Sequence, residues 1–344
     1  MNVLLDNEQL SFNDVLLSPG YSEITSRKNT SLYQRKAVGK HSLKIPILSS
    51  NMDTVTEFSM AFHMAEMGAM GINHRYMTIH ELADLAETWF VNSLHPFAVS
   101  VGCVKNDQGR INFLLRNYKE NNIIICIDIA HGDSKNLKDT VKYIRDEGFE
   151  GTLIGGNVCT FEGTQRLFDW GVDVVKVGVG PGSACTTRVK TGCGFPQFSA
   201  ITECSKAGPI IADGGIKTPG DAAKALAAGA TTVMVGGMLA GTDHTPEWKS
   251  SLDTVTFRGM ASREARNSFN GKVSNAEGIS CLVKTKPKGS TKRVLYNMIE
   301  GIKSAMSYVG ASTLPEFREK ATFVRVTQAT QCENTPHILG TDNV

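Results

Sequence analysis

A glycine-rich loop presents a single cysteine directly behind a strand-like run. The mostly β-branched stretch 174–179 ends in Gly180, Pro181 and Gly182, and Cys185 follows in the sequence VGVGPGSACTTR. Glycines without a Cβ let the backbone approach a ligand closely and turn its amides or carbonyls toward it. The cysteine is therefore a candidate nucleophile at the mouth of a sheet, although a lone cysteine beside a turn is also typical of a small buried apolar residue.

Two glycine pairs follow later apolar runs and indicate an anion site. The sequence ADGG covers 212–215, and VGGM covers 235–238. Barrel enzymes often bind phosphate through backbone amides at the ends of their last two strands. Either pair alone also suits a tight turn, but the two pairs together favour a phosphate cradle.

Composition and charge exclude several kinds of partner. Lys and Arg number 36 against 34 Asp and Glu, which leaves a formal net charge of +2, so we expect neither nucleic acid nor a membrane as partner. The basic run 284–293 is interrupted by Gly and Pro, and we interpret it as a solvated hairpin or flap rather than a phosphate site. No run approaches the roughly 18 apolar residues of a bilayer span, and the N-terminus lacks a signal peptide's basic start, which predicts a cytoplasmic protein. The eight cysteines form no C-x-x-C pair and are expected to be reduced thiols.

Strand-like and helix-like runs alternate through most of the chain. Eight short apolar runs are separated by longer stretches with apolar residues near i, i+3, i+4 and i+7. The pattern predicts an α/β fold, a (β/α)8 TIM barrel with a parallel core, and a doubly wound open sheet is the alternative. The expected strands are 45–50, 69–74, 97–102, 123–130, 151–158, 172–179, 209–215 and 231–238. The expected helices are 58–68, 79–91, 110–120, 135–147, 161–170, 198–206 and 219–228.

The whole chain, 1–344, is predicted to be one barrel domain with an N-terminal extension over 1–44. An irregular region of about 240–290 follows the eighth strand and is long enough to be a mobile flap over the C-terminal face. Helix 291–308 and the tail 321–329 would then close the domain.

Residues able to bind a ligand follow the expected strands at their C-terminal ends, where barrel enzymes carry their chemistry. Besides Cys185 and the glycine pairs they are Ser50, Asn51, Met52, Asp53, His74, Arg75, Asp128, Asn157 and Asp213. The sequence therefore predicts one site at this end of the barrel.

These motifs together resemble one known family. GPGSACTTR, NMDTV (51–55), IADGGI (211–216), MVGGM (234–238) and RGMAS (258–262) are similar to motifs of the inosine-monophosphate dehydrogenase and guanosine-monophosphate reductase family. The resemblance extends over almost the whole chain. It implies a (β/α)8 barrel, usually tetrameric, that binds a purine nucleoside monophosphate beside a nicotinamide cofactor. It also implies a thioimidate between the cysteine and C2 of the purine.

The same resemblance implies roles for individual residues. The catalytic residues would be Cys185, Thr187 and Glu277, the last two relaying a proton. The substrate would contact Ser183, Asp213, Gly214, Gly215, Gly236, Gly237, Gly259, Met260, Ala261, Gly278, Met52 and Asn157. The cofactor, NADPH in the reductases, would contact Ser26, Arg27, His74, Asp128, Ile129, Ala130, Gly178, Ser304 and Ser307. A potassium ion would be bound by Gly180, Gly182, Cys185 and Arg188.

The two activities of the family differ in the fate of the thioimidate. A dehydrogenase hydrolyses it with an Arg-Tyr pair on the flap, whereas no tyrosine occurs here between Tyr143 and Tyr296. A reductase expels ammonia from GMP, and a Thr-Glu relay suits protonation of the leaving amine. We therefore expect a homotetrameric enzyme that uses NADPH to convert GMP to IMP. An IMP dehydrogenase that oxidises IMP to XMP with NAD is the alternative, and a non-catalytic nucleotide-binding barrel is the third possibility.

Some features depart from the reductase pattern. RGMAS and ENTPHI (333–338) look more like the dehydrogenases. Ala261 and Ser274 differ from the Ser and Arg of many reductases, which leaves the base and cofactor contacts at these positions open. The regulatory insert of paired cystathionine-synthase-type modules, found in most dehydrogenases between the second and third strands, is absent, which favours a reductase.

Overall fold

Eight parallel strands form the central sheet of the structure, a computed structural model of the chain. The structure describes all residues except 1–7, 247, 249–253, 271–277, 285–287 and 335–344. The strands are β4 (Ile47–Ser49), β5 (Met70–Gly71), β6 (Phe97–Val101), β7 (Ile123–Asp128), β8 (Thr152–Val158), β9 (Val174–Val177), β10 (Ile210–Asp213) and β11 (Thr232–Val235).

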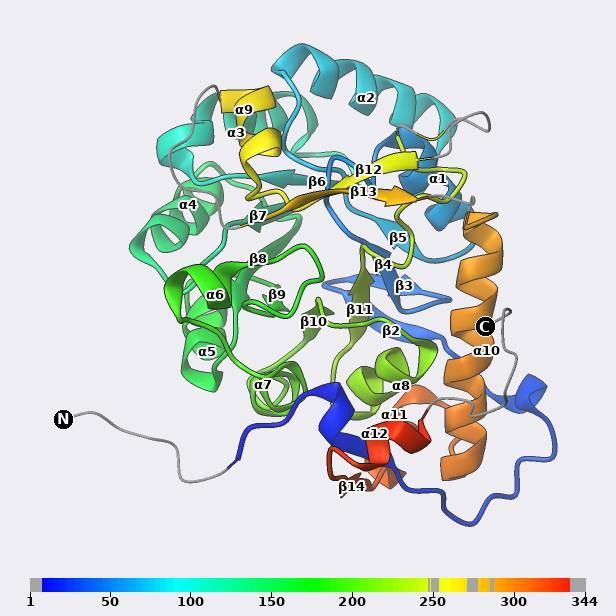
Figure 1. Cartoon of the computed structure of the whole chain (residues 1–344). Coiled ribbons are helices and arrows are strands. Elements are labelled where there is room, and N and C mark those ends of the chain that lie inside the picture. The colour runs from blue at the N-terminus through cyan, green and yellow to red at the C-terminus, as the bar shows by residue number, and fades with distance from the viewer. Residues whose placement is uncertain (1–7, 247, 249–253, 271–277, 285–287, 335–344) are drawn as a thin grey trace.

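The sheet closes into the barrel that the sequence predicts (Figure 1). Its strand order is β5-β4-β11-β10-β9-β8-β7-β6. A parallel bridge between Asn73 and Val99 joins the two ends of this order, just beyond β5 and within β6. Each expected strand run contains one of these strands, so the (β/α)8 fold is confirmed.

Side chains of successive strand residues alternate between two cores. In β7, Ile124 and Cys126 belong to the core inside the barrel, whereas Ile123, Ile125 and Ile127 pack outward against the helices. Both faces of a parallel strand are covered in this architecture, which explains why the runs are apolar throughout rather than alternating.

The helices lie around the outside of the sheet (Figure 1). They are α1 (Phe58–Glu66), α2 (Ile79–Asn92), α3 (Val104–Tyr118), α4 (Lys135–Asp146), α5 (Phe161–Asp169), α6 (Thr187–Thr191), α7 (Gln197–Cys204) and α8 (Pro219–Ala227). Most begin where the sequence indicates, because side-chain oxygens of Thr78, Ser134, Thr160 and Thr218 accept hydrogen bonds from their first turns. Helix α3 begins six residues before the expected 110, and its backbone departs from helical geometry at Asp107.

The N-terminal extension closes the barrel from the end opposite to the predicted site. A hairpin of β2 (Gln34–Val38) and β3 (His41–Leu43) contributes Ala37, Val38 and Leu43 to the core inside the barrel. Nearer the N-terminus, the strand β1 (Val15–Leu17) pairs antiparallel with β14 (Phe323–Arg325) in the C-terminal tail. The tail therefore packs on the start of the chain.

The region after β11 is more regular than expected. The strands β12 (Thr254–Arg258) and β13 (Ser280–Lys284) pair antiparallel, and α9 (Arg263–Asn270) lies between them in the chain. The prediction of an irregular region over about 240–290 is thus wrong for these segments. In 254–258 threonines alternate with the buried Val255 and Phe257, which is the period-2 pattern of a strand, and the prediction did not use this signal.

The basic run also differs from the expected hairpin. Lys284 ends β13, and α10 (Thr291–Val309) begins within the run. The chain then continues through α11 (Leu314–Lys320) and α12 (Thr330–Glu333). The intervening Lys288 lines the large cavity described below.

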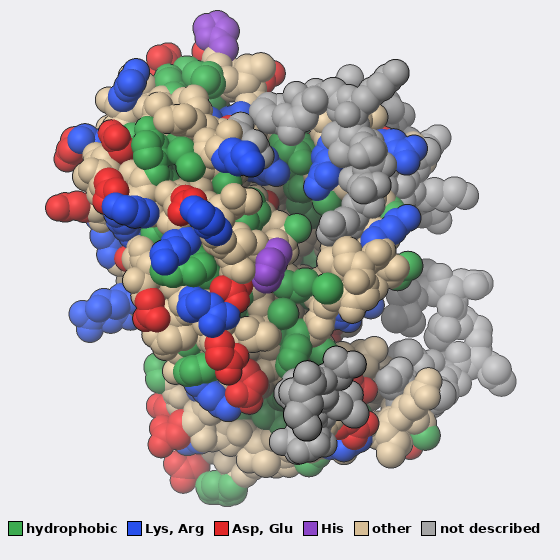
Figure 2. Space-filling model, turned by 90° about the vertical axis from the view of Figure 1, so that its left-hand side faces the viewer, with side chains coloured by type: hydrophobic (Ala, Val, Ile, Leu, Met, Phe, Trp, Pro, Cys, Tyr) green, Lys and Arg blue, Asp and Glu red, His purple; other side chains and the backbone are tan. Residues whose placement is uncertain are grey.

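Acidic and basic side chains mix on the surface over α4 and α5 (Figure 2). Ion pairs there join Lys135 to Asp139, Lys142 to Asp146 and Arg166 to Asp133. This mixture agrees with the near-zero net charge. Among the described residues, no helix is long and apolar enough to cross a membrane.

Candidate active site

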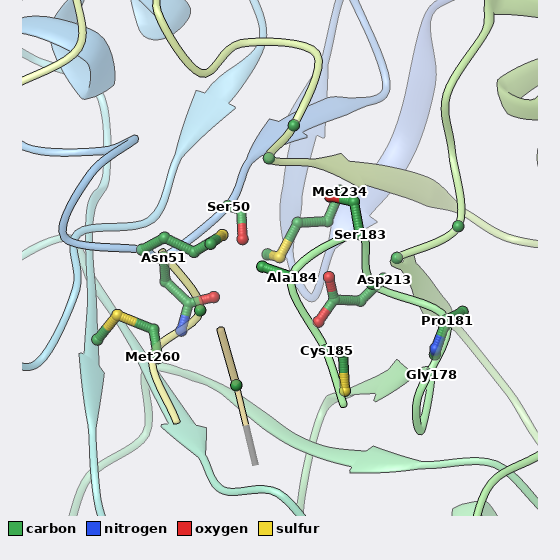
Figure 3. Close-up of a pocket in the computed structure, with 18 of the residues that line it drawn as sticks. Ser50, Asn51, Gly178, Pro181, Ser183, Ala184, Cys185, Asp213, Met234 and Met260 are labelled. Carbon is green, nitrogen blue, oxygen red and sulfur yellow. The ribbon is translucent and has the colours of Figure 1, made fainter. Parts of the chain in front are cut away.

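A cavity of about 910 Å³ opens at the C-terminal ends of the barrel strands. Figure 3 shows Cys185 and Asp213 on one side of it, and Asn51 and Met260 on the other. The volume suits a nucleotide together with part of a second ligand. Of the predicted residues, the cavity lining includes Met52, Asp128, Ile129, Ala130, Asn157, Gly178, Gly180, Gly182, Ser183, Cys185, Thr187, Asp213, Gly214, Gly215, Gly236, Gly237, Gly259, Met260, Ala261 and Gly278.

The cysteine is presented by a tight turn and contacts the predicted relay hydroxyl. The backbone N–H of Cys185 donates to Gly182 O at 3.0 Å, and the thiol donates to Thr187 Oγ1 at 3.2 Å. Cys185 is partly exposed to the cavity, whereas Cys126 and Cys204 are buried and burial raises the pKa of each to about 12. A thiol that reaches the cavity is placed for chemistry, and the fully buried thiols are not.

The segment after α9 packs on the cysteine loop. Cys185 and Gly278 form an antiparallel bridge, and Ile279 N donates to Ala184 O at 3.1 Å. Gly278 N in turn donates to Ala261 O at 3.2 Å. The nucleophile therefore lies against the RGMAS turn and the chain that follows Glu277, while Glu277 and Ser274 themselves lie outside the described residues.

The two glycine pairs lie against the serine of the cysteine loop. A Cβ at Gly237 would lie only 3.0 Å from Ser183 Oγ. A Cβ at Gly214 would lie 3.0 Å from Pro181 Cγ and 3.1 Å from Gly182 N, and its φ of +91° already favours glycine. Larger residues would fill the space between the two strand ends and the loop. The arrangement is a compact cradle lined by backbone and one hydroxyl, which suits a phosphate.

A buried ion-pair network forms the floor of the cavity. Lys176 Nζ lies 2.7 Å from Asp128 Oδ1 and 2.8 Å from Asp213 Oδ2, and the lysine side chain is only 4% exposed. Burial disfavours all three charges, but their mutual attraction prevails: the pKa of Lys176 is raised and the pKa of Asp128 is lowered. Lys176 thus fixes the Asp128 and Asp213 side chains relative to each other in the wall of the cavity.

Asn157 completes the side of the cavity near Asp213. Its Nδ2 donates to Gly178 O at 2.8 Å and to Asp213 Oδ2 at 2.9 Å. Its Oδ1 is buried and has no partner among the described residues. An unpaired acceptor beside a carboxylate fits the hydroxyl donors of a ribose.

The loop after β4 fastens the RGMAS turn to the barrel. Arg258 Nε donates to Asp53 Oδ2 at 3.0 Å, and Asp53 N donates to Met260 Sδ at 3.3 Å. From the next strand end, the Tyr76 hydroxyl donates to Met260 O at 2.8 Å. These contacts fix Met260 on the cavity wall, where the resemblance places the base.

The predicted cofactor residues divide into two groups. Asp128, Ile129 and Ala130 line the cavity beside Arg75, whose guanidinium lies 4.9 Å from the Tyr76 ring centroid. A second cavity of about 370 Å³ shares Arg75 and Ile129 with the first and is also lined by Gly102, Cys103, His131, Ser134 and Asn136.

The other predicted cofactor residues do not line either cavity. His74 is 2% exposed. Its Nε2 lies 3.1 Å from Glu57 Oε1, and its Nδ1 accepts a hydrogen bond from Tyr76 N at 3.1 Å. Ser26 caps the short η2 helix (Arg27–Asn29), and Arg27 Nη1 donates to Ser304 Oγ at 2.9 Å. The structure thus leaves His74, Ser26, Arg27, Ser304 and Ser307 outside the cavity of their own chain.

The proposed potassium residues are compatible with a cation bound by carbonyl groups. Gly182 O and Arg188 O each accept one backbone N–H, from Cys185 and Gly192, and a carbonyl oxygen has a second lone pair. The Arg188 side chain packs on Gly180, where a Cβ would lie 2.5 Å from Arg188 Cγ. Any potassium contact of Arg188 would come from its backbone carbonyl, because a guanidinium is itself a cation and has no acceptor atom.

Sequence reasoning missed several residues of the cavity wall. Lys176 lay inside an expected strand, and its only signal was a charge within an otherwise buried run. Arg75 stood at a strand end without an assigned role, and Tyr76 beside it was not considered. The direction of each side chain beyond β5 could not be read from the sequence, because the chain leaves the sheet there.

Fold and site together define a (β/α)8-barrel enzyme that has a partly exposed cysteine beside a glycine cradle at the C-terminal ends of its strands. Residues 9–337 match the family model described as IMP dehydrogenase / GMP reductase domain, and the chain belongs to this family. Curated relatives named GMP reductase include proteins of Shewanella pealeana (38% identical over 333 residues, 92% of this chain and 95% of the relative) and Vibrio cholerae (38%, with the same coverage). A further relative with this name, from Klebsiella pneumoniae, is 39% identical over 92% of this chain and 95% of its own length.

Proposed function

We propose that the protein is a GMP reductase, which converts GMP, NADPH and a proton to IMP, ammonia and NADP. The observation that carries the proposal is the Cys185 thiol, 3.2 Å from the Thr187 hydroxyl, in a cavity that also contains the glycine cradle. The names of the relatives, at 38–39% identity over most of the chain, support the same activity.

The cavity positions the nucleotide by its three parts. Ser183 and the amides of the glycine pairs bind the phosphate, and Asp213 with Asn157 accepts hydrogen bonds from the ribose. Gly259 and Met260 then flank the base, with Ala261 as the neighbouring residue. This orientation directs C2 of the purine toward the Cys185 sulfur.

The cysteine forms the covalent bond and the hydroxyl beside it handles the proton. Cys185 attacks C2 as the thiolate, and the carbon–nitrogen bond to the 2-amino group breaks as that amine takes up a proton. Thr187 relays this proton from Glu277, which leaves a thioimidate and free ammonia. Bound NADPH supplies the hydride that C2 then accepts. The thiolate leaves as the double bond of IMP is restored.

The side chains on the other half of the cavity suit a nicotinamide cofactor. Asp128, Ile129 and Ala130 line this part, and Arg75 supplies a positive charge for cofactor phosphates. We also propose that backbone carbonyls of the cysteine loop bind potassium, which would stiffen the loop. The homotetramer stays a prediction from the resemblance.

One spectrophotometric comparison tests the function. We expect loss of NADPH absorbance when the protein is mixed with GMP, and no gain of NADH absorbance with IMP and NAD. Brisk production of XMP would instead establish the dehydrogenase. Absence of both ammonia release from GMP and XMP formation from IMP, at every pH, would leave only a nucleotide-binding barrel.

The proton relay predicts a selective defect in Glu277→Gln. The amide cannot donate a proton to Thr187, so we expect kcat to fall about 10²- to 10⁴-fold while GMP affinity stays within about twofold. Steady-state kinetics and calorimetric GMP binding measure the two quantities. Glu264→Gln, in an exposed residue of α9, is the matched control and should behave as wild type. Unchanged turnover in Glu277→Gln would remove this residue from the relay.

We predict that replacing Arg75 weakens the binding of the cofactor and not that of the nucleotide substrate. Its Nε is buried without a partner among the described residues, so a phosphate oxygen would satisfy a group that is otherwise unpaired. Arg75→Met should raise the KM for NADPH about tenfold, as expected for loss of a charge-assisted hydrogen bond, and leave the KM for GMP nearly unchanged. Initial rates at varied NADPH and varied GMP provide the comparison. An equal rise in both KM values would show that Arg75 supports the cavity in general.

A further inference from the structure

Lys288 brings a positive charge to the cradle of the large cavity. Its Nζ donates to Gly237 O at 2.5 Å, and Gly237 is the residue whose Cβ position lies 3.0 Å from Ser183 Oγ. The lysine thus contacts one glycine of the cradle directly, and that glycine lies against the Ser183 hydroxyl. It comes from the connection between β13 and α10, a different part of the chain from the strand ends.

The Lys288 ammonium has one hydrogen-bond partner in the described part of the protein. Lys288 as a whole is exposed, yet neighbouring atoms remove enough water from its charge that burial lowers its pKa. The carbonyl of Gly237 is its one hydrogen-bond partner among the described residues, and an ammonium has three donors. A partly desolvated cation with two remaining donors is matched by an anion rather than by a neutral group.

The cradle itself offers hydrogen-bond donors but no positive charge. Ser183 and backbone amides are neutral donors, and a phosphate monoester carries nearly two negative charges near neutral pH. Lysine binds phosphate as a point charge, and its flexible stem can move a short way from Gly237 O to a phosphate oxygen. Both groups face the same cavity, so one ligand could satisfy both.

We propose that Lys288 is a phosphate-binding residue of the nucleotide site, which supplies the cation that the glycine cradle lacks. The inference rests on the proposed function for the identity of the nucleotide, but the ligand chemistry is that of any phosphate monoester. Lys288 lies between β13 and α10. Its phosphate contact would therefore connect a bound nucleotide to the segment that follows the β12–β13 hairpin.

Calorimetric titration with GMP, guanosine and inorganic phosphate tests the assignment in wild type and Lys288→Met. We expect Lys288→Met to weaken GMP and phosphate binding about tenfold and to leave guanosine binding unchanged. Lys288→Arg, which keeps the charge, should recover most of the loss. Lys292→Met is the matched control, because Lys292 lies on the first turn of α10 and contacts the exposed Tyr296 ring. Thermal unfolding confirms that each variant is folded.

The results separate the phosphate assignment from the activity. Wild-type affinity of Lys288→Met for GMP and phosphate would overturn the assignment, and so would an equal loss for guanosine. If the protein binds phosphate through Lys288 but never releases ammonia from GMP, the assignment stands and the proposed function fails. If ammonia is released at the wild-type KM for GMP by Lys288→Met, the function stands and the assignment fails.

Discussion

Cys185→Ala is expected to reduce GMP-dependent NADPH oxidation by a factor of at least about 10⁴, because Cys185 is the one cysteine among the described residues that line this cavity. The sulfur is the only part of the side chain that the mechanism uses, and alanine keeps the turn that Gly182 and Cys185 form through their backbone. The bound nucleotide should therefore remain in place. Calorimetry should give a GMP affinity within about threefold of wild type, since neither phosphate nor ribose contacts change.

A neighbouring cysteine provides the control for Cys185→Ala. Cys193 is exposed and lies in the connection between α6 and α7, eight residues after the nucleophile. Cys193→Ala should retain wild-type turnover, which excludes a general effect of losing a thiol near the loop. Turnover by Cys185→Ala above a few per cent of wild type would end the covalent mechanism, because hydride transfer would then not require a thioimidate.

The strands and the cysteine loop could be predicted because local pattern decides them. Parallel barrel strands are buried on both faces, so runs such as 123–128 are apolar at almost every position and stand out from the amphipathic helices. The loop is specified by Gly180, whose positive φ and close contact with the Arg188 side chain favour glycine. Both signals depend on a few adjacent residues, which a sequence reveals directly.

The side-chain partners could not be predicted, since they join residues far apart in the chain. Lys288 reaches Gly237 across 51 positions, and Tyr76 reaches Met260 across 184. Sequence reasoning assigned a cofactor role to His74, but the structure buries that ring against Glu57, while Arg75 lines the cavity. Which of two adjacent residues faces the site depends on how the chain turns after β5, and no local pattern encodes that direction.

The buried network around Lys176 leads to the second large effect. Lys176→Met removes the cation that contacts both Asp128, at the end of β7, and Asp213, at the end of β10, and leaves the two carboxyl groups, which are 17% and 19% exposed. Breaking a buried pair by deleting one partner destabilises a protein by about 3 kcal/mol or more, because the remaining charge is uncompensated. The free energy of unfolding, from urea titration near pH 7, should fall by this amount. Both KM values should rise, because the proposed mechanism assigns Asp213 to the substrate and Asp128 to the cofactor.

The free energy of unfolding at acid pH distinguishes a role of Lys176 in this charge network from a role in packing alone. In the wild type, the pKa of Asp128 lies below its usual range, so its contribution to stability is present above about pH 4 and is lost as the pH falls through the lowered pKa. Without Lys176, burial raises the pKa of Asp128, and the loss should begin at a higher pH. Lys142→Met removes an exposed ion pair with Asp146 and should change stability by less than about 1 kcal/mol at any pH. If Lys176→Met unfolds in acid at the same pH as wild type, Lys176 does not lower the pKa of Asp128.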